Sequence, residues 1–275
     1  MRRGRRDSGG YRSVGTPVDP GSLRVLRQGG RVQCAQALTP ADVRVLVREL
    51  GGVHDIELRI HAVHGAPFDV RTLRGWPSLA ALFVDTANVS GLETLDELRA
   101  LQRVRLTANG TPLAALPAPP SVRALALHGF SELNGIARWL HVEDLTVSAC
   151  SGLVAHDLAP LPLRRLLLAH GTYRLADMAS LQVLSELQLH DVPLCVLPDL
   201  TNASALRRIV LRGVRLLRDL TPLSRAPALQ SLTLEAMPQL TIDDLRALRA
   251  LAPTVNVQVR LGSRMLDREV YRMRS

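Results

Sequence analysis

The sequence predicts an α/β fold built as a solenoid, in which short parallel strands alternate with segments that return to the start of the next strand. Three observations point to this fold. An apolar pattern recurs at a nearly constant period, a second apolar set lies between its copies, and only 3% of the 275 residues are aromatic. Leucine alone accounts for 51 residues, and such aliphatic side chains can fill the uniform layers of a repeat array.

The pattern that defines the strands is L-x-x-L-x-L, with valine or isoleucine at some of its apolar positions. The middle residues of its eight clear copies are Leu82, Val104, Leu125, Leu145, Leu166, Leu187, Ile209 and Leu232. The spacings between these residues run from 20 to 23. Alternation of apolar and other residues is typical of a strand with one buried face, so each copy predicts a strand stacked in parallel on its predecessor. Degenerate copies around Val32, Ile56 and Val257 extend the array at both ends.

The segments between the strands carry a second apolar set, for example Leu158 with Leu161. This set closes the core from the side opposite the strands. In the central repeats these segments are too short for a long α-helix, so they predict 3₁₀ or extended turns.

The longer end repeats predict two helices. The first has an N-cap hydroxyl and an N1 proline in Thr39-Pro40, and it ends at Gly51-Gly52. The second begins at Thr241 and stops before Pro253.

This repeat resembles the leucine-rich-repeat family, specifically its short bacterial type, over residues 32–261. The resemblance implies a curved solenoid whose parallel sheet lines a concave face, and a non-enzymatic binding role. The family places an asparagine or cysteine three residues after the strand, where its side chain bonds to turn amides. Only Asn109 and Cys150 fit among the eight residues at this position. We therefore expect most turn amides to bond to water or to neighbouring carbonyls, and Cys150 to lie in the ladder or the core.

The charge of the chain is concentrated at its two ends. There are 34 basic and 25 acidic residues, and residues 1–31 alone hold eight arginines and two aspartates. We interpret residues 1–31 as a disordered basic arm, residues 32–261 as the solenoid and residues 262–275 as a charged C-terminal tail. Both ends admit weak, nonspecific binding to nucleic acid or to an anionic surface, although a solubilising role is the simpler interpretation.

The composition excludes several kinds of chemistry. The sequence contains no lysine, which P-loop, protein-kinase and Schiff-base mechanisms all require. This bias is typical of GC-rich bacterial genomes. Cys34, Cys150 and Cys195 are too few and too scattered for a disulfide framework or a zinc site, which favours a reducing cytoplasm. No apolar run reaches the roughly 18 residues that span a bilayer, so we expect no membrane span.

We expect neither enzymatic activity nor a cofactor. His128, Ser148 and Asp144 fall on neighbouring predicted strands, but an open sheet offers no oxyanion donors and does not exclude water. The His-x-x-His at residues 61–64 lacks a second pair of ligands, so we expect no metal site there.

The side chains between the core positions of each strand point to the concave face and form the candidate surface for a protein or peptide partner. The candidate residues are Phe83, Asp85, Arg103, Arg105, His128, Arg165, Leu167, His190, Arg208, Arg212 and Glu235. They combine apolar anchors with arginines, a mixture enriched at protein interfaces. Phe83 carries most weight, because it is a large aromatic on a water-facing strand. The alternative for Phe83 is that the loop around Pro67-Phe68 covers it.

Other interpretations stay open at this point. Asp144, Arg165, Glu186 and Arg208 alternate in charge across four adjacent strands, either as mutually neutralising pairs or as a docking stripe. The chain could also be the sensor end of a larger signalling protein whose NTPase domain lies elsewhere. A nucleic-acid-associated protein that acts through its arginine-rich ends is the third candidate.

Overall fold

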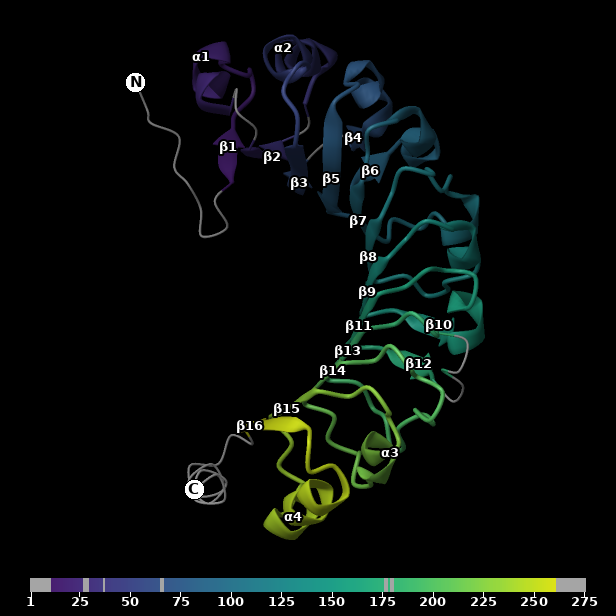
Figure 1. Ribbon diagram of the computed structural model, residues 1–275. Coiled ribbons are helices and arrows are strands. Elements are labelled where there is room, and N and C mark those ends of the chain that lie inside the picture. The colour runs from purple at the N-terminus through teal and green to yellow at the C-terminus, as the bar shows by residue number, and fades with distance from the viewer. Residues whose placement is uncertain are drawn as a thin grey trace. The chain divides into compact units, whose positions relative to one another are not determined.

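The computed structural model describes residues 11–26, 30–36, 38–64, 67–175, 178 and 181–260. Residues 1–10 of the predicted arm and the predicted tail at residues 262–275 lie outside the described residues. The chain divides into unit 1, which comprises Met1–Phe130 and Arg138–His141, and unit 2, which comprises Ser131–Ala137 and Val142–Ser275. Each unit has a parallel sheet with the returning segments on one of its faces (Figure 1).

The sheet of unit 1 is parallel, and its strands follow the order of the chain. They are β1 (Arg12–Val14), β2 (Gly30–Gln36), β3 (Ile56–His64), β5 (Leu79–Asp85), β7 (Arg103–Thr107) and β8 (Ala124–His128). Leu82 lies opposite Val104, and Val104 lies opposite Leu125. These buried residues are the middle positions of three predicted copies, so the observed register is the predicted one.

Residues 11–26 belong to the fold of unit 1, which differs from the expectation of a disordered arm over residues 1–31. They contain β1, α1 (Pro20–Leu23) and η1 (Arg24–Leu26). β1 pairs in parallel with β2, and Val18 and Leu23 are buried. The Val18 amide donates a hydrogen bond of 2.8 Å to Asp42 Oδ1. Apolar residues that are too irregularly spaced to show a period therefore still pack on the first repeat.

The returning segments of unit 1 contain both helices and short strands. They are α2 (Pro40–Leu50), η2 (Val70–Gly75), η3 (Leu92–Glu97), η4 (Leu113–Ala115), β4 (Phe68–Asp69) and β6 (Val89–Ser90), and η5 (Ile136–Arg138) includes residues of both units. β4 and β6 pair with each other. The short 3₁₀ helices confirm the prediction for the short repeats.

Helix α2 begins and ends as predicted. Thr39 Oγ1 accepts a hydrogen bond of 3.2 Å from the Asp42 amide, and the Asp42 carboxylate accepts one of 3.0 Å from the Thr39 amide. Burial alone would raise the pKa of the Asp42 carboxyl, but its hydrogen bonds from Thr39 and Val18 hold that pKa below its ordinary value. Pro40 occupies the first helical turn, and Gly51 follows the last one.

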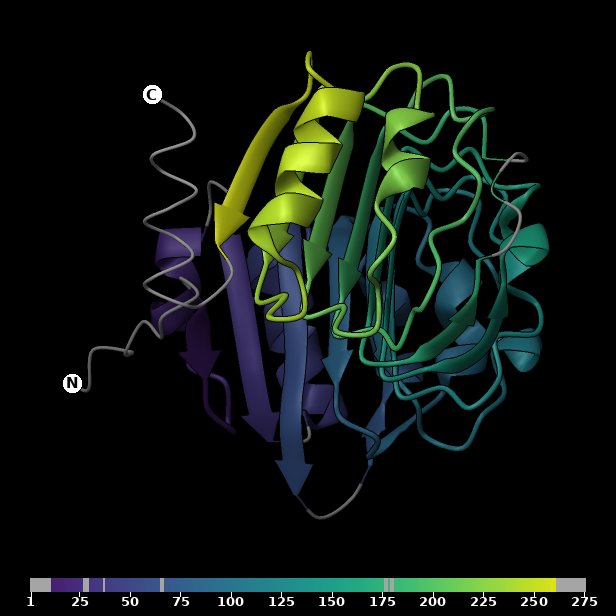
Figure 2. The same cartoon turned by 90° about the horizontal axis from the view of Figure 1, so that it is seen from below.

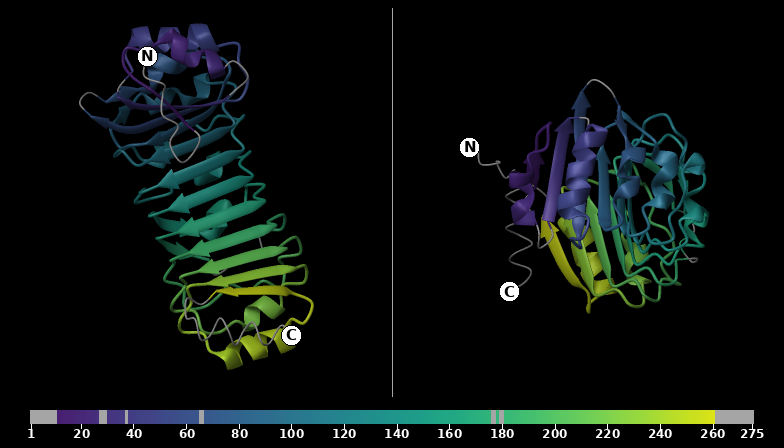
Figure 3. Two further views of the ribbon diagram at one scale, coloured as in Figure 1. Left: turned by 90° about the vertical axis from the view of Figure 1, so that its left-hand side faces the viewer. Right: turned by 90° about the horizontal axis from the view of Figure 1, so that it is seen from above.

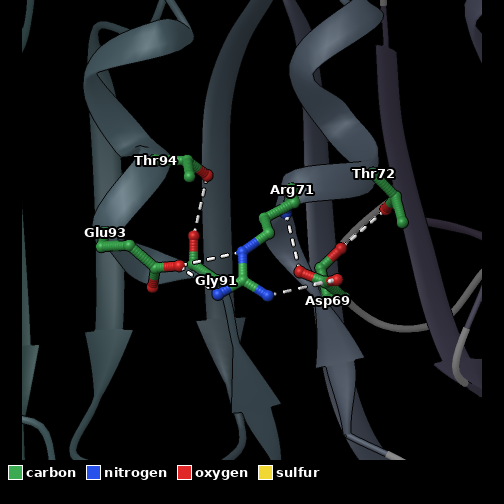
Figure 4. A network of polar contacts seen from close by, with 6 residues as sticks. All are labelled: Asp69, Arg71, Thr72, Gly91, Glu93 and Thr94. Atoms are coloured by element: carbon green, nitrogen blue, oxygen red, sulfur yellow. Dashed lines mark hydrogen bonds and ion pairs between the residues drawn. The ribbon is translucent and has the colours of Figure 1, made fainter.

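A polar network joins two successive returning segments of unit 1 (Figure 4). The Asp69 carboxylate accepts a hydrogen bond of 3.0 Å from the Arg71 amide and so caps η2. Arg71 Nε donates a hydrogen bond of 2.9 Å to Glu93 Oε1 on η3. Between them Gly91 adopts a left-handed φ of 76°, and its carbonyl accepts a hydrogen bond of 2.8 Å from Thr94. The backbone of Gly91 therefore lies close against the capping carboxylate.

Gly91→Ala is expected to destabilise unit 1 by about 2 kcal/mol in urea unfolding. A Cβ at this position would lie 2.4 Å from Asp69 Oδ1 and 3.0 Å from the Arg71 amide nitrogen, so the cap would have to move. Gly110→Ala is the matched control, because Gly110 also has a left-handed φ, of 89°, but a Cβ there meets nothing within 4 Å. The control should cost only about 1 kcal/mol. Equal losses in the two variants would show that the cap is not constrained.

The sheet of unit 2 is also parallel and in chain order. Its strands are β9 (Asp144–Ser148), β11 (Arg165–Ala169), β13 (Glu186–His190), β14 (Arg208–Arg212), β15 (Ser231–Glu235) and β16 (Asn256–Arg260). Leu187 of β13 lies opposite Leu166 on one side and Ile209 on the other, and all three are buried. The predicted register therefore holds in this unit too.

The returning segments of unit 2 resemble those of unit 1. They contain η6 (Ala155–Leu158), α3 (Thr221–Ser224), α4 (Ile242–Leu251) and the paired strands β10 (Ser151–Val154) and β12 (Thr172–Arg174). Figure 2 shows that α4 and α3 lie on the face of the last strands that the returning segments cover. Helix α4 has the predicted N-cap, since Thr241 Oγ1 accepts a hydrogen bond of 3.2 Å from the Asp244 amide. Within the described ranges, no helix has the length and apolar character needed to cross a membrane.

A left-handed residue directly follows most strands of unit 2. The residues with this conformation are Ala149, His170, Asp191, Gly213 and Ala236. The amide of each donates to a carbonyl at the end of the next strand, for example from His170 to His190 at 3.0 Å and from Gly213 to Glu235 at 2.9 Å. The expected bonding of turn amides to neighbouring carbonyls is thus confirmed at these positions.

The position that holds asparagine in the resembling family is mostly apolar here. Phe130, Cys150, Val192, Val214 and Met237 occupy it and are all buried. Side chains at this position therefore add to the core, as expected for Cys150, while backbone groups form the ladder between repeats.

Gly171 at the same position leaves room for a tyrosine. Tyr173 is buried, and its hydroxyl shares its one hydrogen between the carbonyls of Ala169, at 2.7 Å, and Val147, at 3.2 Å. Burial, followed by the neighbouring Cys150, raises the pKa of Tyr173 to about 12. The phenol therefore stays protonated and serves as a donor, in the place of an asparagine amide.

Candidate functional site

Each sheet has one face that the returning segments leave uncovered, and we call it the open face of that unit. In the left-hand view of Figure 3 the teal and green strands face the viewer, and the turns of their repeats lie behind them. Along a strand, residues of the open face alternate with buried ones, as in β7, where Arg103 and Arg105 are exposed and Val104 and Leu106 are buried. The open face is the surface that the repeat pattern predicts as the binding face.

The alternation places all the predicted site residues on the open faces of their units. In unit 1, Phe83 and Asp85 are half-buried, while Arg103, Arg105 and His128 are exposed. The residues in unit 2 are Arg165, Leu167, His190, Arg208, Arg212 and Glu235. Its three arginines are exposed, and Leu167, His190 and Glu235 are half-buried.

The open face of unit 1 carries a compact group of charges, which we call the arginine cluster. It consists of Arg31, Arg59, Arg103 and Arg105 around the carboxylates of Glu57 and Asp85. Arg31 Nε lies 3.8 Å from Glu57 Oε1, and Arg103 Nη1 lies 3.4 Å from Glu57 Oε2. The partners of Asp85 are Arg59, with its Nε at 2.5 Å, and Arg105, with its Nη1 at 3.6 Å. Each carboxylate is therefore shared between two guanidinium groups.

Aromatic rings hold several of these guanidinium groups in place. The Arg105 guanidinium stacks over the Phe83 ring at 4.8 Å from its centroid. Those of Arg59 and Arg31 lie 5.3 and 5.7 Å from the centroid of Tyr11. Stacking of this kind is favourable and fixes the plane of an arginine side chain.

The loop around Pro67-Phe68 is not what covers Phe83. Phe68, in the loop expected to cover it, lies in β4 among the returning segments and is fully buried in the core. Arg105, from the next strand, is what lies over Phe83. The ring therefore supports a guanidinium and is not a bare apolar anchor.

Tyr11 and Glu57 belong to the arginine cluster, although the sequence does not single them out as candidates. Glu57 is almost fully buried, and the Tyr11 hydroxyl donates a hydrogen bond to its carboxylate. Burial, followed by this hydrogen bond, raises the pKa of Tyr11 to about 12. The sequence places Tyr11 in the predicted disordered arm, and the local signals against that prediction are scattered apolar residues such as Val14, Val18 and Leu23, which join the core.

The open face of unit 2 carries a row of alternating charge that is balanced. Arg165 contacts both carboxylate oxygens of Asp144, with Nε at 2.5 Å from Oδ1, and this hydrogen bonding raises the pKa of Arg165. Arg208 Nε lies 3.5 Å from Glu186 Oε1. The row therefore contains mutually neutralising cross-strand pairs, one of the two alternatives that the sequence leaves open, each worth a few tenths of a kcal/mol up to about 1.

A second row of unit 2 places titratable groups side by side. His190 lies opposite Arg212, which lies opposite Glu235. Burial, and then the charge of Arg212, lowers the pKa of His190 below its ordinary value. His190 is therefore mostly neutral at pH 7 and adds little positive charge to this face.

The structure shows where several candidate groups for metal or acid–base chemistry lie. Among them no group of three histidine, cysteine or acidic side chains is placed to hold a metal ion, and the side chain of His64 lies outside that part of the chain. Asp144 is engaged by Arg165 through both oxygens, so it does not orient an imidazole. Burial raises the pKa of the Cys34 thiol to about 12, which keeps it protonated and unreactive.

Comparisons with known proteins identify the fold. No family model matches the sequence, and no curated protein matches it. Among solved structures, the chain is similar to an internalin, InlF, of Listeria monocytogenes, with a TM-score of 0.56 and 15% identity over 90% of this chain and 78% of that one. A leucine-rich-repeat protein of Leptospira interrogans gives a TM-score of 0.54 at 13% identity, covering 86% of this chain and 67% of the other. The functional domain of InlJ from Listeria monocytogenes, which includes a cysteine ladder, gives 0.52 at 11% identity over 88% and 60%.

Proposed function

Because the chain is a leucine-rich-repeat solenoid, we propose that it is a non-enzymatic binding module that presents its open face to a protein or peptide partner. The fold is a scaffold for such surfaces, and the proposal depends on what the open faces carry.

The observation that carries the proposal is the set of large side chains that remain accessible on otherwise uncovered sheet faces. The side chains of Arg103 and Arg105 in unit 1 are each 44% exposed, and those of Arg165 and Arg208 in unit 2 are 63% and 56% exposed. Leu167 lies half-buried among the charges of unit 2. Arginine is one of the residues enriched at the energetically important positions of protein interfaces.

The proposal includes a cytoplasmic setting and a partner held without a cofactor. Its support is that Cys34, Cys150 and Cys195 form no disulfide with one another, and that two of them are buried. A role as the sensor end of a larger signalling protein is compatible with the same surface, because it would use the same open face.

The test is capture of a partner from a lysate of the source organism, followed by titration of the identified protein. Phe83→Ala, which removes the platform under Arg105, and the double variant Arg208→Glu with Arg212→Glu should each weaken binding by about 1 kcal/mol or more, roughly fivefold. The matched control is Arg225→Glu with Arg246→Glu, which makes the same charge change next to α3 and on α4.

Thermal melting of the open-face variants should stay close to that of the parent protein, since the replaced side chains lie outside the core. The proposal fails if the control weakens binding as much as the open-face variants do, or if neither open-face variant weakens it.

A further inference from the structure

The two open faces differ in local charge, and this difference points to a partner. In unit 1 the arginine cluster sets four guanidinium groups against the two carboxylates of Glu57 and Asp85. In unit 2 the row of Asp144, Arg165, Glu186 and Arg208 is neutral, and the second row sets Arg212 and Arg260 against the single carboxylate of Glu235. Resting on the proposed function, we propose that the arginine cluster of unit 1 binds an acidic peptide segment of the protein partner.

The exposure of each charged side chain in the cluster determines which charge is accessible to a partner. The side chains of Glu57 and Asp85 are only 3% and 15% exposed, so the two carboxylates form its floor. The side chains of Arg31, Arg103 and Arg105 are 53%, 44% and 44% exposed and lie above them. The accessible surface of the cluster is therefore positive, although the acids lie within it.

The arginines are fixed before any partner arrives. Arg105 is held by the Phe83 ring and by Asp85, and Arg59 by the Tyr11 ring and by Asp85. An arginine held in one orientation presents planar N–H pairs that match a carboxylate, and it loses little side-chain entropy on binding. At 3.4 and 3.6 Å, the ion pairs of Arg103 with Glu57 and of Arg105 with Asp85 are longer than ideal N–H···O bonds. These guanidinium groups thus keep donor capacity for a second carboxylate.

The aromatic residues of the cluster favour a peptide over a single-stranded nucleic acid. Nucleic-acid-binding proteins of this kind stack bases on exposed aromatic faces. Here Arg105 lies over Phe83, and Tyr11 is buried beside Arg31 and Arg59. Both rings already stack on guanidinium groups, so they leave little aromatic surface for bases. The exposed guanidinium groups are instead suited to ion pairs with carboxylates.

The test uses the full-length protein and a fluorescein-labelled peptide of alternating glutamate and glycine, about twelve residues long. Binding is measured by fluorescence anisotropy beside the same peptide with glutamine in place of glutamate, and beside a labelled oligothymidylate of similar length. We expect the glutamate peptide to bind, to weaken with added salt, and to bind more tightly than both other probes.

Two variants of the cluster separate charge from geometry. Arg103→Gln with Arg105→Gln should weaken binding of the glutamate peptide by about tenfold or more. Arg103→Lys with Arg105→Lys keeps the charge beside Glu57 and Asp85, so it should fold even if the glutamine variant does not, and it should bind several-fold more weakly than the parent. Two matched controls, Arg208→Gln with Arg212→Gln in unit 2 and Arg44→Gln with Arg99→Gln on returning segments of unit 1, should bind like the parent.

The outcomes distinguish this inference from the proposed function. Tighter binding of the oligothymidylate, equal binding of the glutamine peptide, or unchanged binding by both cluster variants would overturn the acidic-peptide inference. If the acidic-peptide inference fails but partner capture still depends on the open face of unit 2, the proposed function stands. Partner capture that no open-face variant affects would instead overturn the proposed function, whatever the peptide does.

Discussion

Leu187→Asp is expected to unfold unit 2, with a loss of about 4 to 5 kcal/mol or more. Leu187 is 0% exposed in the middle of β13, between Leu166 and Ile209, so a carboxylate there would be buried with no partner. A loss of this size is a large part of the stability of an ordinary domain. Thermal melting by circular dichroism, together with the soluble fraction on expression, measures it.

Gln188→Asp is the control for this prediction. Gln188 is the next residue of the same strand but is half-buried on the open face, so its replacement leaves no fully buried charge and loses one hydrogen bond, of 2.8 Å, that its amide donates to Glu186. Its effect should remain within about 1 kcal/mol. A Leu187→Asp protein that melts like the parent would contradict the assignment of inward and outward residues in β13.

The second large effect is expected for Gly171→Ala, with a loss of about 3 kcal/mol. A Cβ on Gly171 would lie 2.2 Å from the carbonyl oxygen of Cys150 and 2.3 Å from the hydroxyl oxygen of Tyr173. Neither can move freely, because the first is backbone and the second donates a hydrogen bond of 2.7 Å to Ala169. Urea unfolding measures the loss.

Gly75→Ala serves as the comparison for the Gly171 variant. A Cβ on Gly75 meets nothing within 4 Å, and its backbone conformation suits any residue. This variant should lie within about 0.5 kcal/mol of the parent. If the two variants were equally stable, Tyr173 would not fill the space beside Gly171 as described.

The core could be predicted from the sequence because each repeat carries its own strand signal. The spacing of Leu166, Leu187 and Ile209 is enough to set these residues opposite one another. The two helices α2 and α4 could be predicted for a similar reason, since Thr39 and Thr241 cap them through contacts three residues away.

The arginine cluster could be predicted only in part. Alternation along the strands places Arg103 and Arg105 on the open face, but it does not show which carboxylate each one meets. The role of Tyr11 depends on the pairing of β1 with β2, which joins residues far apart in the chain and leaves no periodic trace. The cover on Phe83 depends on the side-chain conformation of Arg105, which sequence spacing does not encode.

The placement of residues 11–26 changes how the arginine-rich N-terminus can be studied. Removing all of residues 1–31 would delete β1, α1, η1 and the first two residues of β2 along with the arginines, and so leave Val32, which pairs with β1 and is now fully buried, at an open edge of the sheet. Such a shortened protein would bind ligands more weakly because its first repeat is disrupted. The weaker binding would then be mistaken for the effect of the missing positive charges. Truncation after residue 10 removes Arg2, Arg3, Arg5 and Arg6 while retaining Tyr11 and its hydrogen bond to Glu57. A truncation that tests the N-terminal arginines without disturbing the fold should therefore end at residue 10, well before the first copy of the repeat pattern.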